Sequence, residues 1–296
     1  MCIRDSPYFV AYEQLNTMDR DRIYGNMSVT GHIIPEQLSL TLRAGVDFSN
    51  DFRTQQKPQY SHSYTNGMYR EQTVRNVEFN TDFLLSWRRT FGDFYLNASL
   101  GGNAMLSNNS NVSLLANQLD EPNVFILQNV SGQLDVRATR TKKAINSFYG
   151  FLSMSWRDMI FIDVTGRNDW SSTLPVNNNS YFYPSVSASV LLNELIDFGA
   201  ARNVVNLVKL RGSFAQVGHD TQPYRTTDYL SSSDFAGNYQ IPGTMNNANL
   251  RPEIVSSWEV GLDLRMFRNR LGVDLAYYNN TSKDLICLLY TSPSPR

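Results

Sequence analysis

Apolar and polar residues alternate one by one along most of this chain. The stretch from Ile160 to Leu192 shows the pattern twice, as IFIDVTGRNDW and as SYFYPSVSASVLL, with SSTLPVNNN between them. A period of two predicts a β-strand with one apolar and one polar face. The linker is rich in Ser, Asn and Pro, which favour turns. We therefore predict a long β-hairpin, with Trp170, Tyr181, Phe182 and Tyr183 gathered where its two arms meet the linker.

The same alternation predicts about ten strands in all. Their ranges are 22–33, 38–49, 73–88, 94–106, 145–156, 160–170, 180–192, 204–216, 254–267 and 270–281. Two segments are less regular. Residues 8–14 form a short apolar piece that fits the end of a strand, and residues 193–203 fit either one helical turn or a loop.

Strand length and connection length together indicate the fold class. Strands of soluble proteins usually have about 5–6 residues, but these hold their alternation for about 11–14. About ten residues cross the apolar band of a bilayer when a strand is tilted by about 45°. The connections after Ile33 also alternate between short and long, although 193–203 is longer than its place predicts. Outer-membrane barrels show this asymmetry, with short periplasmic turns and longer extracellular loops.

Charged residues fall on the polar face of the predicted strands. They are Arg43, Asp47, Glu78, Asp82, Asp163, Arg167, Lys209, Arg211, Glu259, Asp263, Arg265 and Asp274. Between two packed sheets each would need a partner or cost several kcal/mol, whereas a wet or plugged lumen tolerates them. A solvent-facing sheet tolerates them too, but ten amphipathic strands with little helix to cover the apolar face favour a barrel. We predict an all-β fold, an antiparallel transmembrane β-barrel fragment that is open as written.

Composition narrows the function classes. The net charge of −1 does not favour a nucleic-acid partner, and the mean hydropathy of −0.35, with no long apolar run, excludes a helical membrane protein. His32, His62 and His219 lie far apart, and no Cys/His cluster has the spacing of a metal site. No catalytic motif is present, so the sequence predicts neither an enzyme nor a cofactor.

Both ends differ from the sequence between them. MCIRDS and CLLYTSPSPR break the alternation and resemble translated adapter sequence. We expect residues 1–6 and 287–296 to be non-native flanks, together with Cys2 and Cys287, and 7–286 to be an internal part of a longer barrel. The first residues contain no apolar signal sequence, so we expect the true start of an exported protein to lie upstream.

Four ordered blocks carry a family resemblance. They are VTGRNDWSSTLP, SYFYPSVSASVLLNE, VKLRGSFAQVGHDTQPYRT and NANLRPEIVSSWEVGLDLRMFRNRLGVDLAYYNNTSKDLI, and the upstream RDRIYGNMSVTGHI fits as well. Together they resemble the barrel of SusC/RagA-type TonB-dependent outer-membrane transporters. The resemblance implies a barrel of about 22 strands, plugged by an N-terminal domain, in the outer membrane of a Gram-negative, Bacteroidetes-like bacterium.

The resemblance also implies a function and partners. Such a protein would import glycan or peptide fragments with energy delivered through the TonB complex, and a SusD-like surface lipoprotein would act as a lid. The sequence does not identify the substrate. The chain contains neither a plug nor a TonB-contacting segment, so we expect that as written it would not transport. The alternative is a surface β-rich adhesin or carbohydrate-binding module without transport.

Candidate contact residues lie near the predicted loop ends of strands and in the longest loop. Arg167, Asn168 and Asp169 fit substrate or lid contacts, or a hydrogen-bond cluster that holds the loop. Trp170, with its aromatic neighbours, fits sugar stacking or an aromatic girdle at the membrane interface. The long-loop candidates for ligand or partner contacts are Tyr224, Tyr229, Phe235 and Tyr239.

Overall fold

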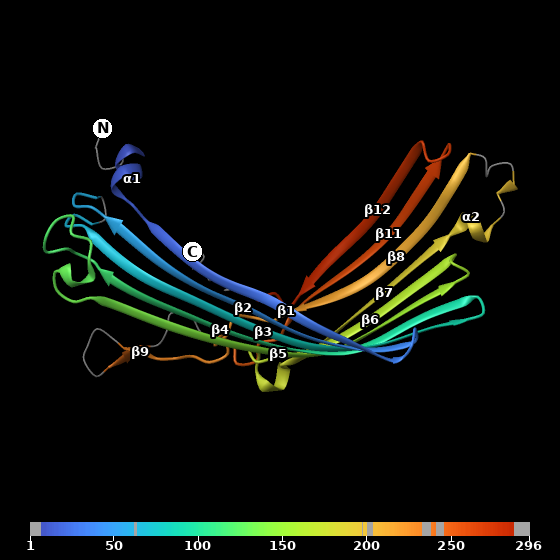
Figure 1. Ribbon diagram of the computed structural model, residues 1–296, viewed down its shortest axis with the longest axis horizontal. Coiled ribbons are helices and arrows are strands. Elements are labelled where there is room, and N and C mark those ends of the chain that lie inside the picture. Colours follow the sequence, from blue (N-terminus) through green and yellow to red (C-terminus); the bar gives the residue numbers. More distant parts are fainter. Residues whose placement is uncertain are drawn as a thin grey trace, which may run out of the picture. The chain divides into compact units, whose positions relative to one another are not determined.

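The computed structural model of this chain is built almost entirely of strands. It describes residues 7–61, 64–196, 198–199, 204–232, 238–240 and 246–286. Ten strands form one sheet in the order β1-β2-β3-β4-β5-β6-β7-β8-β11-β12, so that β1 and β12 are its edges (Figure 1). Neighbouring strands of the sheet from β5 to β12 pair antiparallel. The predicted all-β, antiparallel and open fold is confirmed.

Most strands are long, and helices are short. The strands of the sheet are β1 Thr17–Ile34, β2 Leu38–Lys57, β3 Met68–Phe91, β4 Phe94–Ala116, β5 Asp135–Trp156, β6 Ile160–Ser171, β7 Ser180–Leu191, β8 Val205–His219, β11 Glu253–Met266 and β12 Leu271–Lys283. The helices are α1 Pro7–Glu13, α2 Leu192–Leu195, η2 Leu127–Asn129 and η3 Val176–Asn178, and β9 Ser231–Ser232 pairs with β10 Tyr239–Gln240. Among the described residues no helix is long and apolar enough to span a membrane.

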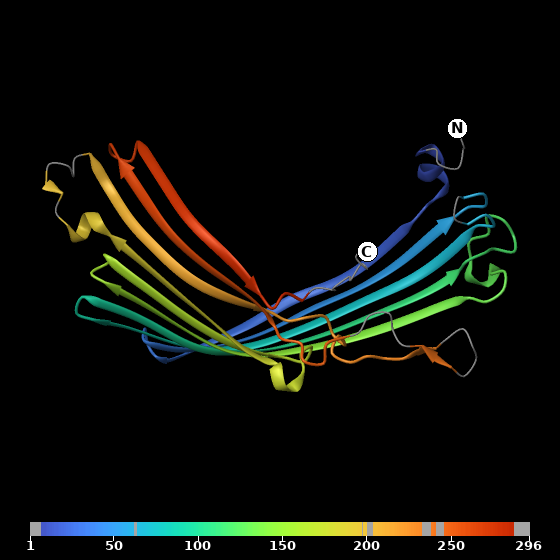
Figure 2. The ribbon, with the colours of Figure 1, turned by 180° about the vertical axis from the view of Figure 1, so that it is seen from behind.

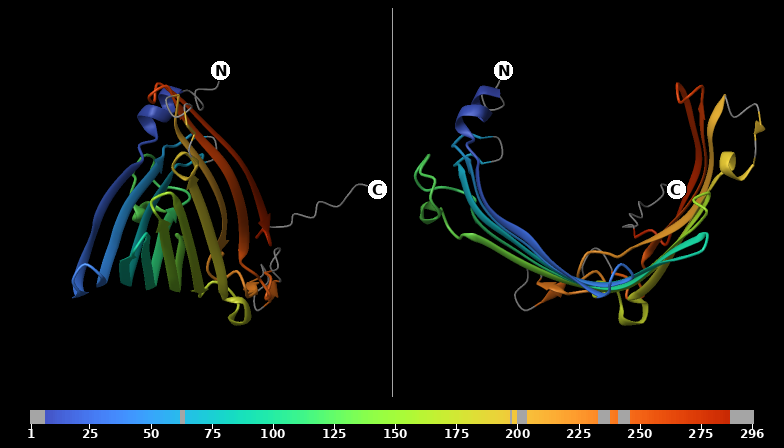
Figure 3. Two further views of the ribbon diagram at one scale, coloured as in Figure 1. Left: turned by 90° about the vertical axis from the view of Figure 1, so that its right-hand side faces the viewer. Right: turned by 45° about the vertical axis from the view of Figure 1, so that its right-hand side comes forward.

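The chain divides into two compact units. Unit 1 comprises Met1–Met27, Ala44–Asn80 and Met105–Lys143, and unit 2 comprises Ser28–Arg43, Thr81–Ala104 and Ala144–Arg296. Unit 1 contains α1, η2 and the loop-side parts of β1 to β5 (Figure 2). Unit 2 contains the turn-side parts of those strands and all of β6, β7, β8, β11 and β12, with α2 in the connection from β7 to β8 (Figure 3).

Apart from the connection between β7 and β8, the connections alternate in length as the sequence predicts. Short turns join β1 to β2, β3 to β4, β5 to β6 and β11 to β12, whereas long loops follow β2, β4 and β8. Arg157 and Asp158 both have positive φ, at 50° and 55°, and the amide of Met159 donates to the carbonyl of Trp156 at 2.9 Å. Consecutive positive φ values match the right-handed twist of a two-residue hairpin. The turn predicted before Ile160 is therefore present.

Several strands continue farther than their alternation predicts. Polar pairs extend the ladders of unit 1: Arg70 donates to Gln55 at 3.1 Å, and Gln72 donates to Asn111 at 2.9 Å. Because most residues there are polar, the apolar period disappears while backbone pairing continues. Accordingly β2 runs to Lys57, beyond its predicted end at residue 49, and β3 begins at Met68, before its predicted start at residue 73.

The short apolar piece at residues 8–14 is not a strand end, and that prediction is wrong. Pro7–Glu13 forms helix α1, in which the rings of Tyr8 and Tyr12 stack with centroids 6.5 Å apart. Residues four apart share one face of a helix, so this pair favours the helix. For residues 193–203, helix α2 supports the helical-turn alternative, although part of the segment lies outside the described residues. The two predicted flanks, both cysteines and His62 also lie outside the described residues.

The apolar face of unit 2 is a continuous surface one layer thick. Val190, Leu210, Leu262 and Leu275 face one another across β7, β8, β11 and β12. Leu210 remains 45% exposed and Leu275 60% exposed. In the described part of the unit, no second sheet or long helix packs over these side chains. An apolar face that water contacts over many strands would be unfavourable, so it is suited to lipid.

Close packing on β4 depends on a residue without a side chain. A Cβ placed on Gly101 would lie 2.8 Å from the carbonyl oxygen of Phe83 and within 2.7 Å of the Tyr149 ring. We expect Gly101→Ala to destabilise the folded protein by about 1–3 kcal/mol, because backbone cannot move aside as a flexible side chain can.

The matched control for this glycine is Gly212→Ala. A Cβ placed on Gly212 would lie 3.9 Å from the carbonyl oxygen of Glu259, which is ordinary van der Waals contact. Chemical unfolding of both variants in lipid vesicles measures the difference. Equal stability of the two variants would contradict the packing that we describe around Gly101.

Candidate functional site

A cluster of charged and aromatic side chains lies at the loop ends of β6 and β7 in unit 2. We name it the Asp169 cluster; it consists of Ser147, Tyr149, Arg167, Asp169 and Tyr183. Arg167 donates from Nε to Asp169 Oδ1 at 2.7 Å and from Nη2 to Ser147 Oγ at 2.9 Å. Tyr183 donates its hydroxyl to Asp169 Oδ2 at 2.6 Å. Both carboxylate oxygens are therefore satisfied.

Burial makes these hydrogen bonds strong. Asp169 is 6% exposed and Tyr181, beside it on β7, is 7% exposed. The Tyr181 and Tyr183 rings stack with centroids 5.9 Å apart, and Tyr181 packs directly against Gly218 at a distance that leaves no room for a Cβ. Arg167 also places its guanidinium 5.7 Å from the centre of the Tyr149 ring. The result is a packed polar layer and not an open catalytic group.

A second group of polar side chains connects the β6–β7 loop to the end of β8. Ser171 Oγ donates to Asp220 Oδ2 at 2.5 Å, and Thr173 Oγ1 donates to the same oxygen at 3.1 Å. Ser171 is 1% exposed and Thr173 is 3% exposed. The carboxylate of Asp220 thus holds the two loops together.

A cleft of 690 Å³ adjoins Asp220. Most of the residues that line it are polar, including His219, Asp220, Gln222, Arg225, Asn246 and Glu253. They offer cationic, anionic and amide groups from the end of β8, the long loop and the start of β11. This arrangement suits a ligand with several hydrogen-bonding groups. Among the described residues no group of three or more His, Cys, Asp and Glu is placed to hold a metal ion.

The four consecutive candidates on β6, residues 167–170, lie on two faces of the sheet, because successive side chains of a strand point in opposite directions. Arg167 and Asp169 share one face and meet in the Asp169 cluster. Asn168 instead donates to Ser180 Oγ at 3.0 Å, and Trp170 is 42% exposed. The arrangement of Arg167 and Asp169 favours a role in holding the loop, whereas Trp170 is available at the surface.

The described long-loop candidates do not line the cleft, and Phe235 lies outside the described residues. Tyr224, Tyr229 and Tyr239 are 51%, 64% and 74% exposed. Sequence reasoning did not single out Ser171, Thr173 or Asp220. The sequence feature that could have pointed to this group is the position of Asp220. It is a carboxylate directly after the last residue of a strand, where a side chain can reach the neighbouring loop.

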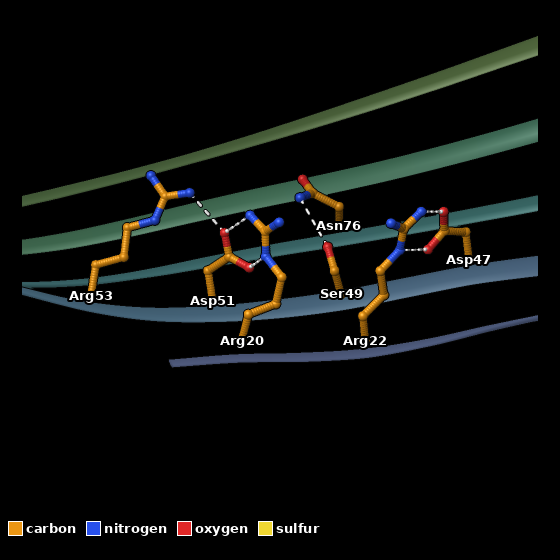
Figure 4. Close-up of polar contacts among 7 residues, drawn as sticks. All are labelled: Arg20, Arg22, Asp47, Ser49, Asp51, Arg53 and Asn76. Carbon is orange, nitrogen blue, oxygen red and sulfur yellow. Dashed lines mark hydrogen bonds and ion pairs between the residues drawn. The ribbon is translucent and has the colours of Figure 1, made fainter. Parts of the chain in front are cut away.

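A separate ladder of ion pairs joins β1 and β2 within unit 1 (Figure 4). Arg20 donates to both oxygens of Asp51, at 2.6 and 2.8 Å, and Arg53 donates to Oδ2 at 2.7 Å. Next along the strands, Arg22 makes the same two-point contact with Asp47, at 3.0 and 2.6 Å. Asp51 is 1% exposed, so its charge is balanced by the protein.

Comparison with known proteins identifies the family. The sequence model described as "TonB dependent receptor-like, beta-barrel" matches residues 4–296. This chain belongs to the TonB-dependent receptor family. Receptors of this family are transporters of the outer membrane and not enzymes.

Two curated relatives come from Formosa agariphila. TonB-dependent receptor P26 is 25% identical over 254 residues, which cover 80% of this chain and 25% of that protein. TonB-dependent receptor P39 is 25% identical over 281 residues, which cover 88% of this chain and 25% of that protein. The receptor chain therefore spans about a quarter of the length of these relatives.

Solved structures share the fold. The RagAB peptide transporter matches with a TM-score of 0.78 and 20% identity, over 98% of this receptor chain and 32% of the matched chain. The ferric-catecholate import receptor Fiu from E. coli matches with a TM-score of 0.56 and 12% identity, over 90% and 41% of the two chains. At these identities the likeness establishes the fold. It agrees with the SusC/RagA-type resemblance of the sequence blocks, which is confirmed.

Proposed function

We propose that this receptor chain is part of an outer-membrane transporter that imports glycan or peptide fragments. A SusD-like surface lipoprotein and the TonB complex are the proposed partners. The observation that carries the proposal is the division of the strands into two faces. One face is apolar and uncovered in the described residues, and the other holds ion pairs, as expected for a wall between lipid and a wet lumen.

The polar face of unit 2 is balanced within itself. Arg211 on β8 donates to Glu259 on β11 at 3.3 Å and to Asp274 on β12 at 3.0 Å. Arg43 on β2 likewise donates to Asp82 on β3 at 2.8 Å. Side chains that neutralise one another across strands can line water without a packed partner layer. This supports a lumen, and it gives an adhesin with two stacked sheets no support.

The ladder of unit 1 keeps its charges at neutral pH. Asp51 lies about thirteen residues beyond the start of β2, and about ten residues cross an apolar band, so we propose that it lies on the loop side of that band. Hydrogen bonds from Arg20 and then Arg53 hold the pKa of the Asp51 carboxyl below its ordinary value. Because its pKa is lowered, the Asp51 carboxylate is ionised at and above about pH 4, where an ordinary aspartate would begin to take up a proton. The stabilising effect of its ion pairs is lost only as the pH falls through the lowered pKa.

The cleft beside Asp220 is the proposed ligand contact of this part of the receptor. Its amide and charged groups suit the backbone amides and termini of a peptide, and they also suit sugar hydroxyls. The RagAB match, whose own description names a peptide transporter, favours peptides as the first class to test.

The test is uptake by cells that carry the complete receptor. We expect labelled oligopeptides or oligosaccharides to enter only when TonB and the proton gradient are both present. In the cleft, Arg225→Gln should weaken ligand binding by about 5–20-fold, because a hydrogen bond to a charged group contributes about 1.5–3 kcal/mol and part is replaced by the amide.

The matched control is Arg268→Gln, which removes the same charge from the short turn between β11 and β12. We expect it to leave binding and uptake unchanged. Uptake that continues without TonB would contradict the proposed function. Equal effects of the two arginine substitutions would contradict the assignment of the cleft.

A further inference from the structure

Three cations gather in a cleft on unit 1 that the transport proposal does not use. We name Arg75, Arg140 and Lys142 the exterior basic cluster. They line a cleft of 310 Å³ with Val77, Asn108 and Ser110, across β3, β4 and β5. Among the described residues that line this cleft, three are cationic and none is acidic. Such a concentration of positive charge suits an anionic ligand.

The cluster lies on the apolar side of the strands and not on the lumen side. Asn76, next to Arg75, donates to Ser49 at 3.3 Å on the face that carries the Arg20–Asp51 ladder. Consecutive residues of a strand point to opposite faces, so Arg75 points outward. Its guanidinium stands 5.2 Å from the centre of the Phe48 ring, and Val77 follows it on the same face.

The exterior basic cluster lies where outward positions of β4 change from apolar to polar. Leu106 is followed at the next two outward positions by Asn108 and Ser110, which line the cleft. Such a change is expected where a barrel strand passes from the apolar band into the headgroup region. The cluster therefore lies on the loop side of Leu106, at this change.

We propose that the exterior basic cluster binds the phosphate of a phosphorylated lipid headgroup in the outer leaflet. Guanidinium groups bind phosphate through two parallel hydrogen bonds, and lysine adds a point charge. Asn108 and Ser110 supply further donors between them. The lipid chains would lie against the apolar residues nearer the membrane, including Leu106, which is 58% exposed. Free phosphate would use the charges alone, so the adjoining apolar surface favours a lipid. This inference rests on the proposed outer-membrane location.

The test uses the complete receptor purified in an uncharged detergent. Its probes are lipid A with both phosphates, the same lipid without phosphates, and inorganic phosphate. Native mass spectrometry and a binding titration should detect phosphorylated lipid A at least about tenfold tighter than either other probe. The triple variant Arg75→Gln, Arg140→Gln, Lys142→Gln should bind it at least about tenfold more weakly, since it removes all three cations that would pair with the phosphates.

The matched control changes charges on the other face of the same strand. Arg137→Gln with Lys143→Gln removes two cations of β5 at positions of opposite parity, and we expect lipid binding to be unchanged. Equal binding of the two lipids, equal weakening by the control, or full binding by the folded triple variant would overturn the inference. Two separate measurements test the proposed function and location: uptake by cells, and the stability of Leu210→Lys, a variant with a charge on the apolar face that is described in the Discussion. Failure of the lipid site is therefore distinguishable from failure of the proposed location or function.

Discussion

Leu210→Lys is expected to lower the free energy of unfolding by about 2–4 kcal/mol when the complete receptor is folded in a bilayer. Leu210 is 45% exposed on the apolar face and stands between Val190 and Leu262. It lies about five residues from the turn-side end of β8, which places it near the middle of an apolar band. A lysine there must either lose its hydration or distort the bilayer.

The control adds the same charge to the other face of the same strand. Ser213 lies opposite Glu259 on β11, so Ser213→Lys gains an acidic neighbour on the polar face. We expect that variant to be as stable as the original protein. Urea unfolding from phosphatidylcholine vesicles, followed by tryptophan fluorescence, measures both. If Ser213→Lys cost as much as Leu210→Lys, the assignment of the two faces would be wrong.

Asp169→Asn is expected to destabilise the folded receptor by about 2–3 kcal/mol. The carboxylate accepts one hydrogen bond from Arg167 and one from Tyr183, and it is 6% exposed. An amide removes the charge pair and offers a donor where an acceptor is needed, which leaves a partly buried guanidinium without its counter-charge. The expected loss of stability is smaller than for a fully buried ion pair because the Arg167 side chain is 39% exposed.

Asp163→Asn is the matched control, because Asp163 lies on the same strand and face but is exposed. Among the described residues Asp163 accepts one side-chain hydrogen bond, from Ser187 at 3.3 Å, and we expect the substitution to change the free energy of unfolding by no more than about 0.5 kcal/mol. Tyr183→Phe should fall between the two, since it removes only the hydroxyl donor. If the Asp169 and Asp163 variants unfold at the same urea concentration, the Asp169 cluster does not hold this end of the sheet.

A role in holding the loop and a role in contacting ligand predict different effects of a substitution on uptake. A residue that holds the loop should affect stability first, and uptake only as the folded population falls. A residue that contacts ligand should change uptake in the folded receptor. Measuring uptake per folded receptor for Asp169→Asn and for Arg225→Gln therefore separates support from recognition.

The sequence alone determined the strands, their faces and the family. Alternation is a local property of neighbouring residues, so segments such as Ile160–Ser171 and Val205–His219 are evident without knowledge of their partners. The same alternation placed Arg211 and Asp274 on the polar face before any pairing was known. The order of short and long connections predicted which ends of the strands carry loops, because hairpin turns and loops differ strongly in composition.

Tertiary structure decided which of these residues meet. The bond from Tyr183 to Asp169 depends on the β6–β7 register, and the bonds of Ser171 and Thr173 to Asp220 join residues almost fifty positions apart. The outer part of β3, from Met68, pairs through polar side chains that carry no apolar period. The exterior basic cluster likewise forms only when three strands lie side by side. A one-dimensional pattern specifies the face on which a side chain lies, but the register between strands decides its neighbours, and those neighbours determine the chemistry.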